Sequence, residues 1–364
     1  MSIFEIKHQE QAIDIFQQAF MSERLSHAYI LLGPRGIGKS SAAIEFAKIL
    51  LCENPQSKEN YLDSCSRCSS CKLVDAQTHP DFHLIYKELV SLIPGKKEHK
   101  AIELGIDVIR TELIEKVSLK PTMNKAKVFV VYEADRMTRA SQNAILKTLE
   151  EPPAKTYIFL VTEQLGALLP TIRSRAQVLK FNLLPYKFVY DKLIENGAKA
   201  CQAEFLSKFA PGQLGTALEL LQLGAYDINR RIADELAHIK VADIEDFAQW
   251  MIKEAQSLAS KMLEIRKEQF LANPSESELN RNALKLLLEM VGCFYRDTIR
   301  YKLGFEEGDL INSEQIELIK SYSEKCNIDE LSDKIRMLSE AEKMINANVN
   351  QNLLMTDVFC KVIE

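Results

Sequence analysis

Hydrophobic residues in the first half of the chain alternate between short continuous runs and segments with helical spacing. The continuous runs, such as AYILL and KVFVV, are rich in β-branched and aromatic residues. Apolar residues recur every three or four positions in the segments between them. Strands that alternate with amphipathic helices are typical of a parallel sheet covered by helices. The pattern predicts this α/β fold for residues 1–182, with strands at 28–33, 82–86, 127–132, 157–162 and 178–184.

The pattern changes near Pro185, and helical periodicity dominates from there onward. Residues 183–225 contain short amphipathic pieces divided by Gly and Pro, which predict a small helical domain. Longer helical segments follow, among them 243–271, and they predict a helical bundle over 226–364. A chain of 364 residues exceeds what one hydrophobic core usually serves, so two or three domains are expected from its length.

Composition and charge argue against several classes of protein. The net charge of −5 lacks the basic surplus of a stand-alone nucleic-acid binder, and Lys96, Lys97 and Lys100 form only a small basic turn. The longest apolar stretches, such as 157–161, fall short of the roughly 20 residues that span a bilayer. The N-terminus does not resemble a signal peptide. We therefore expect a cytoplasmic protein without a membrane partner.

Residues 33–40, GPRGIGKS, match the phosphate-loop pattern G-x-x-x-x-G-K-[ST] between a predicted strand and a predicted helix. The glycines let successive backbone N–H groups surround phosphate oxygens, Lys39 supplies a cation, and Ser40 can reach Mg²⁺. The start of the helix adds partial positive charge. The alternative is a glycine turn that merely opens a helix. The predicted nucleotide-binding residues are Gly33, Pro34, Arg35, Gly36, Ile37, Gly38, Lys39, Ser40 and Ser41.

The acidic residue that normally works with a phosphate loop is missing from this sequence. In P-loop NTPases an Asp at the end of a second buried strand holds the metal, because Mg²⁺ prefers hard oxygen ligands. Here the strand is followed by Tyr132, which cannot replace a carboxylate at neutral pH. Glu133 stands where a water-activating carboxylate would lie, and Asp135 follows two residues later. Alternatively, Glu133 and Asp135 are solvated surface acids. The sequence predicts a degenerate metal position.

Four of the eight cysteines follow a C-x12-C-x2-C-x2-C pattern. In a reducing compartment such clustering favours a metal over disulfides. The thiolates of Cys52, Cys65, Cys68 and Cys71 would fill all four positions of a tetrahedral Zn²⁺ site, which leaves none for a substrate water. We therefore predict a structural site that stabilises an insertion with little apolar content. The alternatives are free thiols, or replacement of one cysteine by His79.

Several segments together resemble the delta-prime family of clamp-loader subunits of bacterial DNA polymerase III, which are AAA+ proteins. They are LSHAYILLGPRGIGKSS, the four-cysteine insertion with THPDFHLI, KVFVVYEADRMTRASQNAILKTLEEPP, YIFLVTEQLGALLPTIRSRAQVLKF and NANVNQNLLMTD. LKTLEEPP and the Ser-Arg pair are shared with the tau/gamma ATPase subunit, and 226–340 carries little motif information. The resemblance implies an AAA+ P-loop domain at 1–182 with a zinc module at 52–71, a lid domain at 183–225 and an oligomerising collar at 226–364.

The resemblance also implies a role for Arg175 in TIRSRAQ. ATP sites of clamp loaders lie between subunits, where an arginine of one subunit touches the γ-phosphate bound by the next. A guanidinium supplied in trans can raise turnover by roughly 10³ to 10⁵. Arg175 matches this arginine finger, Arg173 is the near alternative, and Ala176 replaces the family's Cys. Without the family, both arginines would be ordinary surface charges.

Two further positions match the family's nucleotide sensors. Thr162 matches the polar sensor of the γ-phosphate and joins the predicted nucleotide-binding residues. Hydrolysing subunits have an arginine in the lid motif G-S-x-R-x-A-L, whereas this chain reads GQLGTAL, with Gly215 at that position. The changes at Tyr132 and Gly215 both favour binding without hydrolysis, because the lost groups act mainly on the transition state.

The resemblance thus predicts a non-hydrolysing or weakly hydrolysing subunit that donates Arg175 to a neighbouring ATP site and helps load the sliding clamp onto primed DNA. It implies the tau/gamma and delta subunits as partners, structural Zn²⁺, and ATP or ADP with Mg²⁺. The assembly is a DNA-directed DNA polymerase, a nucleotidyltransferase, but no intrinsic ATPase activity is expected of this chain. The alternative is an active tau/gamma-like ATPase, which predicts an acid at 132 and an arginine at 215. A zinc-dependent nucleic-acid binder conflicts with the charge balance.

Overall fold

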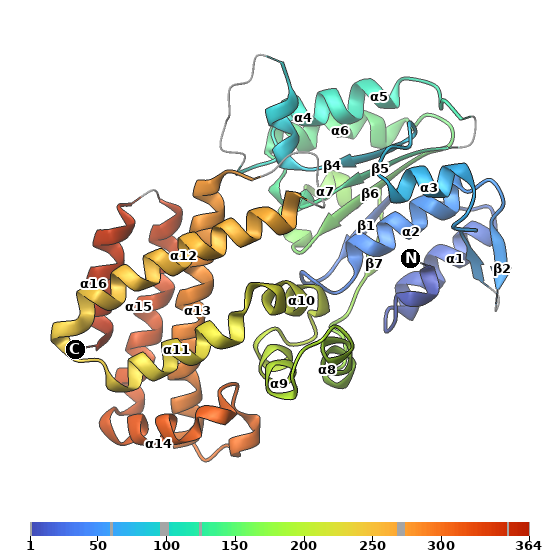
Figure 1. Cartoon of the computed structure of the whole chain (residues 1–364). Helices are drawn as coiled ribbons and strands as arrows, with labels where there is room; N and C mark the ends of the chain where they lie inside the picture. The colour runs from blue at the N-terminus through green and yellow to red at the C-terminus, as the bar shows by residue number, and fades with distance from the viewer. Residues whose placement is uncertain are drawn as a thin grey trace. The chain divides into compact units, whose positions relative to one another are not determined.

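The computed structural model describes residues 2–58, 61–94, 102–123, 126–267, 274–347 and 349–363. The predicted basic turn at Lys96, Lys97 and Lys100 lies outside them. The chain divides into two compact units (Figure 1). The first is Met1–Pro185 with Gly212–Gly215, and the second is Tyr186–Pro211 with Thr216–Glu364. The three-domain division stays a prediction.

The first unit is built on a five-stranded parallel sheet in the order β4-β5-β6-β1-β7. Its strands are β1 (Ala28–Leu32), β4 (Phe82–Ile85), β5 (Lys127–Val131), β6 (Thr156–Thr162) and β7 (Gln177–Lys180). β1 pairs with β6 from Ala28↔Ile158 to Leu32↔Thr162. Because all five strands run parallel, their carboxyl ends meet at one edge of the sheet, where ligands of such sheets bind. The phosphate loop follows β1 at this edge, and Tyr132 follows β5.

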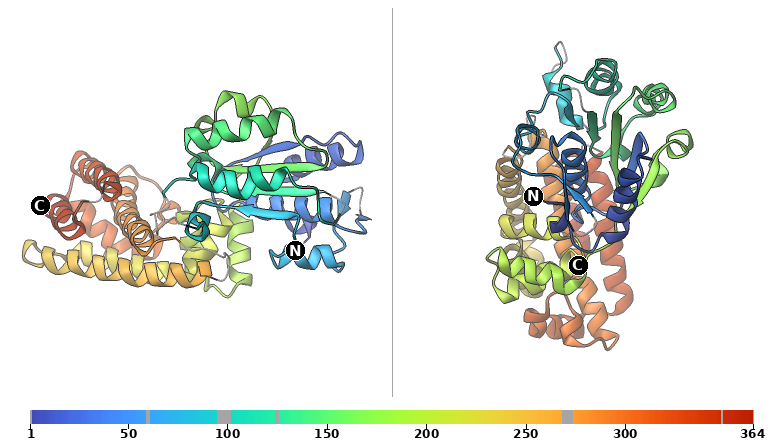
Figure 2. Two further views of the ribbon diagram at one scale, coloured as in Figure 1. Left: turned by 90° about the horizontal axis from the view of Figure 1, so that it is seen from above. Right: turned by 90° about the vertical axis from the view of Figure 1, so that its right-hand side faces the viewer.

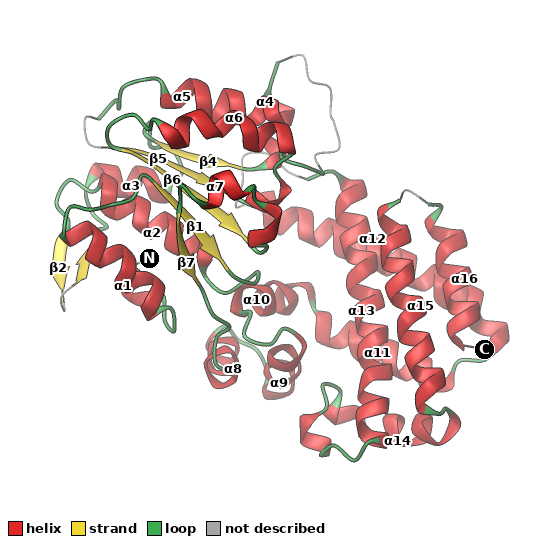
Figure 3. Ribbon diagram, turned by 180° about the vertical axis from the view of Figure 1, so that it is seen from behind, coloured by secondary structure: helices red, strands yellow, loops and turns green. Residues whose placement is uncertain are grey.

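Helices lie on both faces of this sheet, as Figure 3 shows from behind. They are α1 (Glu10–Met21), α2 (Lys39–Leu51), α3 (Ser69–Asp75), α4 (Ile106–Ile109), α5 (Glu115–Val117), α6 (Arg139–Glu150) and α7 (Pro170–Arg173). A π-helical turn at Arg110–Ile114 separates α4 from α5. The cysteine insertion adds an antiparallel pair, β2 (Gln56–Lys58) and β3 (Tyr61–Asp63), which the hydrophobic pattern did not predict.

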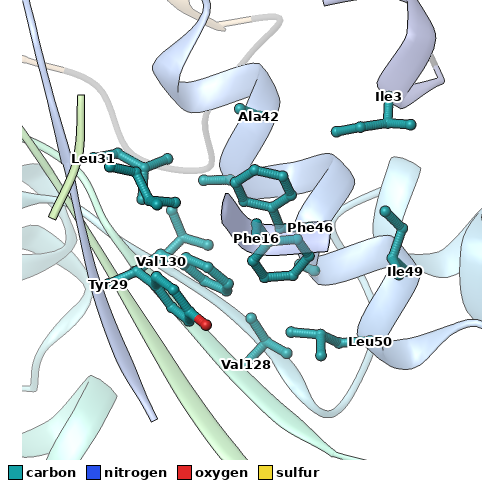
Figure 4. Packing of buried hydrophobic residues seen from close by; sticks show 14 of the residues in the cluster. Ile3, Phe16, Tyr29, Leu31, Ala42, Phe46, Ile49, Leu50, Val128 and Val130 are labelled. Carbon is teal, nitrogen blue, oxygen red and sulfur yellow. The ribbon is translucent and has the colours of Figure 1, made fainter. Parts of the chain in front are cut away.

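Aromatic rings pack beside α2 within a core that is otherwise mostly aliphatic (Figure 4). Phe16 of α1 stacks on Phe46 of α2 with ring centroids 3.9 Å apart, and Tyr29 stacks on Phe159 at 5.5 Å. All four rings are fully buried. Burial of one such side chain stabilises a fold by about 1.5–3 kcal/mol. This packing fixes α2 against the sheet and so holds the phosphate loop at its start.

The described residues of the second unit form helices. They are α8 (Tyr186–Glu195), α9 (Ala200–Phe209), α10 (Leu214–Leu223, whose first two residues belong to the first unit), α11 (Ala225–His238), α12 (Ile244–Lys267), α13 (Glu276–Lys302), α14 (Ile316–Lys325), α15 (Ile328–Asn346) and α16 (Gln351–Ile363). α12 packs on α13 and α16, and α15 packs on α13 and α16, which makes a bundle (Figure 2). Within the described residues, no helix has both the length and the apolar character of a membrane span. The predicted fold class, a parallel sheet with helices followed by a large helical region, is confirmed.

Candidate functional site

The phosphate loop connects the end of β1 to the start of α2. Gly38 precedes α2 with a φ of 99°, a left-handed conformation that glycine adopts without strain. At Gly33 a Cβ atom would lie 2.6 Å from the carbonyl oxygen of Phe181, so the loop passes close to the chain after β7. Gln9 holds the loop from the other side, because its Nε2 donates to the carbonyl of Ile37 at 3.2 Å. These contacts define the loop's path within the first unit.

Lys39 lies inside the loop with only 5% of its surface exposed. Its Nζ donates to the carbonyl oxygens of Gly33 and Pro34, both at 2.5 Å. Burial lowers the pKa of Lys39 to about 8, although the carboxylates of Glu163 and Asp135 act in the opposite direction. The ammonium is therefore mostly charged at neutral pH and stands at the first residue of a 13-residue helix. Its position suits contact with a phosphate group.

The remaining loop residues differ in exposure. Ile37 is buried, Gly36 and Ser41 are half-buried, and Arg35 and Ser40 are exposed. The positive charge of Arg35 also lowers the pKa of Lys39, so the two cations lie close enough to repel each other. A loop that gathers two cations and a helix start favours an anionic ligand.

Tyr132 directly follows β5, at the position where other P-loop NTPases carry a metal-binding Asp. Its backbone N–H donates to the carbonyl of Ile85 at 2.8 Å and so continues the β4–β5 pairing. The ring packs against the aromatic core, and its hydroxyl is hydrogen-bonded to the side chain of Ser40. Burial raises the pKa of Tyr132 well above its ordinary value. A neutral phenol thus contacts the serine of the phosphate loop.

The two acids after Tyr132 have specific partners. Glu133 adopts a left-handed backbone with a φ of 47°, and its carboxylate lies 3.4 Å from Nζ of Lys87. Asp135 accepts hydrogen bonds from the hydroxyl of Thr162 at 2.9 Å and from the backbone N–H of Glu163 at 3.2 Å. The ion pair with Lys87 was missed at the sequence level, because no motif links Lys87 to the end of β5.

Thr162 is buried at the end of β6 and faces the same edge as the loop. Its backbone carbonyl accepts from the N–H of Gly33 at 3.2 Å, so the predicted sensor touches the first residue of the loop. The predicted sensor position Gly215 also reaches the loop, since its N–H donates to the carbonyl of Gly36 at 2.7 Å. A Cβ at Gly215 would lie 3.1 Å from Cα of Gly36. This close backbone contact leaves little room for an arginine there.

Arg175 lies in the turn between α7 and β7, apart from these contacts. Its guanidinium pairs with Glu150 at 2.8 Å and donates to the carbonyl of Thr171 at 3.0 Å and to Oγ of Ser174 at 3.4 Å. None of these partners belongs to the phosphate loop. Arg173 is half-buried. Glu150 was not singled out from the sequence, although it lies within the motif LKTLEEPP.

The four predicted cysteine ligands converge. The Sγ atoms of Cys52, Cys65, Cys68 and Cys71 all lie within 4.8 Å of one another. Backbone N–H groups point at the sulfurs: Cys65 donates to Cys52 at 3.3 Å and Cys68 donates to Cys65 at 3.4 Å. Hydrogen bonds from the Arg67 and Cys68 backbone help to lower the pKa of Cys65 to about 6, which favours the thiolate. This donor set fits one tetrahedral ion of the zinc type.

His79 lies outside this cluster. Its Nδ1 accepts from the N–H of Asp81 at 3.0 Å, and its Nε2 lies 3.3 Å from Oγ of Ser70. With both ring nitrogens engaged and burial lowering its pKa, this histidine is a hydrogen-bonded structural residue in the described chain. The alternative in which His79 replaces a cysteine is not supported by this arrangement.

A buried charge cluster connects α2 to the cysteine insertion. Lys48 is fully buried and lies 3.2 Å from Glu45 within α2 and 3.1 Å from Asp75 at the end of α3. Burial raises the pKa of Glu45 to about 7, although Lys48 opposes the shift. The helix that begins in the phosphate loop is therefore tied to the insertion by Lys48 as well as by Cys52 at its end.

Comparisons with known proteins show the family of the chain. A family model described as "DNA polymerase III, delta subunit" matches residues 8–185, and a second model, for the C-terminal part of the same family of subunits, matches 242–363. The delta' protein of Bacillus subtilis DNA polymerase III is 28% identical over 95% of this chain and 94% of its own length. The delta' protein of Escherichia coli is 31% identical over 60% of this chain and 62% of its own.

Related proteins and solved structures are similar at lower identity. The tau protein of Bacillus subtilis DNA polymerase III is 26% identical over 93% of this chain and 57% of its own length. A gamma subunit-related protein of Thermotoga maritima has a solved structure with a TM-score of 0.46 and 18% identity over 96% of this chain and 97% of that chain. With two family models that match most of the chain and several delta' relatives, this chain belongs to the delta-prime family of DNA polymerase III clamp-loader subunits.

Proposed function

We propose that this clamp-loader subunit binds nucleotide, hydrolyses it slowly or not at all, and donates Arg175 to the ATP site of a neighbouring subunit. The observation that carries the first part is the hydrogen bond between Tyr132 and Ser40 at the metal position. Phosphoryl transfer needs cations that neutralise the charge developing on the phosphate oxygens. A neutral phenol in contact with the loop serine supplies no such charge. Nucleotide is thus held without being split.

The sensor region supports the same conclusion. Gly215 has no side chain to reach the γ-phosphate, and its backbone is already bonded to Gly36. Glu133, the residue placed to activate a water, is paired with Lys87. The chain can therefore bind nucleotide without hydrolysing it. The loop and Lys39 stabilise phosphate in the ground state, whereas the groups lost at positions 132 and 215 act on the transition state.

The position of Arg175 suits a role in trans. About a third of its side chain is exposed, and its partner Glu150 is half-exposed, so the pair lies at the surface of the first unit. A guanidinium on a surface turn can enter a site on another chain, where it would stabilise the charge on a transferring phosphoryl group. The relatives named delta', tau and gamma/tau support partners of the tau/gamma and delta types, with the sliding clamp and primed DNA as ligands of the assembly.

The remaining parts of the proposal are structural. The four-cysteine cluster would hold Zn²⁺ in a closed site without a water ligand. Residues 183–225 would form the lid, and 226–364 would form the collar that joins the ring. The chain would then be a cytoplasmic, non-catalytic part of a DNA-directed DNA polymerase.

Steady-state ATP hydrolysis tests both halves of the proposal. The purified chain should show a turnover far below the typical range of about 1–10³ s⁻¹, and the reconstituted loader with Arg175→Ala should lose most of its rate. Arg173→Ala tests the alternative finger: it should keep the rate, and a loss there instead of at Arg175 would assign the role to Arg173. Brisk turnover by the isolated chain that Lys39→Ala abolishes would instead establish an active tau/gamma-like subunit. A full rate in the Arg175→Ala loader would disprove the trans role.

A further inference from the structure

We propose that the phosphate loop of this chain takes a nucleoside diphosphate or triphosphate without a divalent cation, because a neutral phenol, Tyr132, follows β5 where a metal-binding carboxylate would lie. This inference rests on the proposed function in one respect, namely that the loop binds nucleotide. It departs from the expectation, drawn from the family resemblance, that ATP or ADP binds with Mg²⁺. The reason is the kind of oxygen atoms at this edge of the sheet, which belong to a neutral phenol and to carboxylates that already have partners.

Magnesium makes strict demands on a binding site. It requires nearly octahedral oxygen ligands, and in P-loop proteins it is held by the loop Ser or Thr and by an Asp beyond the second strand. In this chain the loop residue is Ser40, and its side chain is hydrogen-bonded to Tyr132. The residue beyond the second strand is Tyr132 itself, a neutral phenol. The hydrogen bond between them leaves the lone pairs of Ser40 available, but the second place holds an uncharged phenol instead of a carboxylate.

The neighbouring carboxylates do not compensate for this loss. Glu133 is turned by its left-handed backbone and pairs with Lys87 at 3.4 Å. Asp135 receives the hydroxyl of Thr162 and the backbone N–H of Glu163. To serve a metal, either acid would first have to give up these contacts, and Asp135 would also release Thr162. Of the three residues at the usual metal position, Tyr132, Glu133 and Asp135, none therefore offers a carboxylate without another partner.

Fixed positive charge at the loop offers a different way to balance a phosphate. The guanidinium of Arg35 lowers the pKa of the Lys39 ammonium, although the carboxylates of Glu163 and Asp135 raise it more strongly. Such repulsion between like charges is relieved when an anion binds between them. The start of α2, at Lys39, adds partial positive charge and the N–H groups of a first helical turn. The ammonium of Lys39 donates to two loop carbonyls, which phosphate oxygens can replace.

The site therefore resembles an anion site of a helix N-terminus more than a metal–nucleotide site. Its affinity comes from Lys39, Arg35 and backbone N–H groups, none of which needs a cation. This arrangement also gives a chemical reason why a bound nucleotide would persist, since phosphoryl transfer without a metal lacks its main source of charge neutralisation.

Titration of the full chain with a fluorescent N-methylanthraniloyl ADP, once in excess EDTA and once in excess MgCl₂, tests the inference. We expect dissociation constants that agree within about twofold. Tyr132→Asp should introduce a carboxylate and free Ser40, so that binding becomes about tenfold or more tighter with Mg²⁺ than with EDTA. Tyr132→Phe removes the hydroxyl without adding a carboxylate and should gain no magnesium dependence.

The outcomes separate this inference from the function on which it rests. Binding by the unaltered chain in MgCl₂ but not in EDTA would overturn metal-free binding and leave the nucleotide-binding function intact. Absence of binding in both buffers would refute nucleotide binding itself. If the melting curve shows that Tyr132→Asp does not fold, the affinities of the unaltered chain in EDTA and in MgCl₂ still determine whether binding needs the metal.

Discussion

The guanidinium of Arg175 lies 2.8 Å from the carboxylate of Glu150, the last residue of α6. The pair connects the end of α6 to the turn before β7, and both side chains are partly exposed. Exposed ion pairs of this kind contribute about 0–1 kcal/mol and weaken as salt screens them. An arginine that must reach a neighbouring nucleotide has to leave this partner first.

Replacing Glu150 by Gln should therefore release Arg175. We expect the ATPase rate of the reconstituted loader to rise about two- to fivefold at low salt, because up to about 1 kcal/mol no longer opposes the movement. The increase should shrink at high salt. Glu151→Gln, at the adjacent residue, is the matched control and should leave the rate unchanged. Equal rates for the two variants would show that the Glu150 pair does not restrain Arg175.

Nucleotide affinity should fall at alkaline pH. The pKa of Lys39 is about 8 in the folded chain, so its ammonium is present below that pH and is lost above it. Because phosphate needs the charged form, the dissociation constant should rise about tenfold for each pH unit above roughly 8. Lys39→Arg keeps its charge throughout, so its affinity should change little over the same range. A flat profile for the unaltered chain would contradict a lysine-dependent site.

Removal of one cysteine ligand should release the metal. Cys68→Ser is expected to reduce zinc from about one ion per chain to almost none and to lower the melting temperature, because metal binding contributes directly to folding. Cys360→Ser lies outside the cluster and should retain the ion. Elemental analysis of both purified variants provides the measurement. Full zinc content in Cys68→Ser would exclude the four-thiolate site.

The buried Glu45 should make stability depend on pH. Its folded pKa of about 7 exceeds the ordinary value of 4.5, so the folded chain holds this proton more tightly than the unfolded chain. Stability is consequently greatest below about pH 4.5 for this group and declines as pH rises to about 7, by at most about 3 kcal/mol. Glu45→Gln should flatten the decline, whereas Glu5→Gln, at an exposed position, should preserve it. Chemical denaturation across this pH range measures the slope.

Because Gly215 is closely packed, replacing it by alanine should be more harmful than replacing a glycine in open space. A methyl group at Gly215 would lie 3.1 Å from Cα of Gly36, whereas one at Gly166 would meet nothing within 4 Å. Gly215→Ala should therefore weaken nucleotide binding and lower stability by about 1–3 kcal/mol relative to Gly166→Ala. Thermal melts and nucleotide titration of both variants make the comparison. Equal melting temperatures and equal nucleotide affinities for the two variants would show that the backbone at Gly36 shifts at little cost.

Features encoded by neighbouring residues could be predicted from the sequence. The apolar runs predicted the bounds of β1, β4, β5 and β6 to within two residues of those in the structure. The spacing of glycines and cysteines over short segments predicted the phosphate loop and the cysteine cluster. The last strand was expected at 178–184 but β7 ends at Lys180. The physical reason is Gln9, which donates to the carbonyl of Asn182 at 2.8 Å and accepts from its N–H at 2.9 Å. These backbone groups are thereby used outside the sheet.

Pairings between distant segments could not be predicted in this way. The contact of Lys87 with Glu133 depends on β4 lying beside β5, and a linear pattern does not give strand order. The helical stretch from Ile106 to Val117 is interrupted by a π-helical turn at Arg110–Ile114, which hydrophobic spacing does not reveal. Motif spacing thus predicted which chemical groups are present, whereas tertiary packing determines which residues they contact.

α2 has 13 residues and is therefore a rod roughly 20 Å long. Its first residue is Lys39 of the phosphate loop, and Cys52 of the cysteine cluster follows its last residue. Phe46 fixes its middle by stacking on the buried ring of Phe16. If the cysteines hold an ion, its removal should therefore loosen one end of this helix and weaken nucleotide binding at the other.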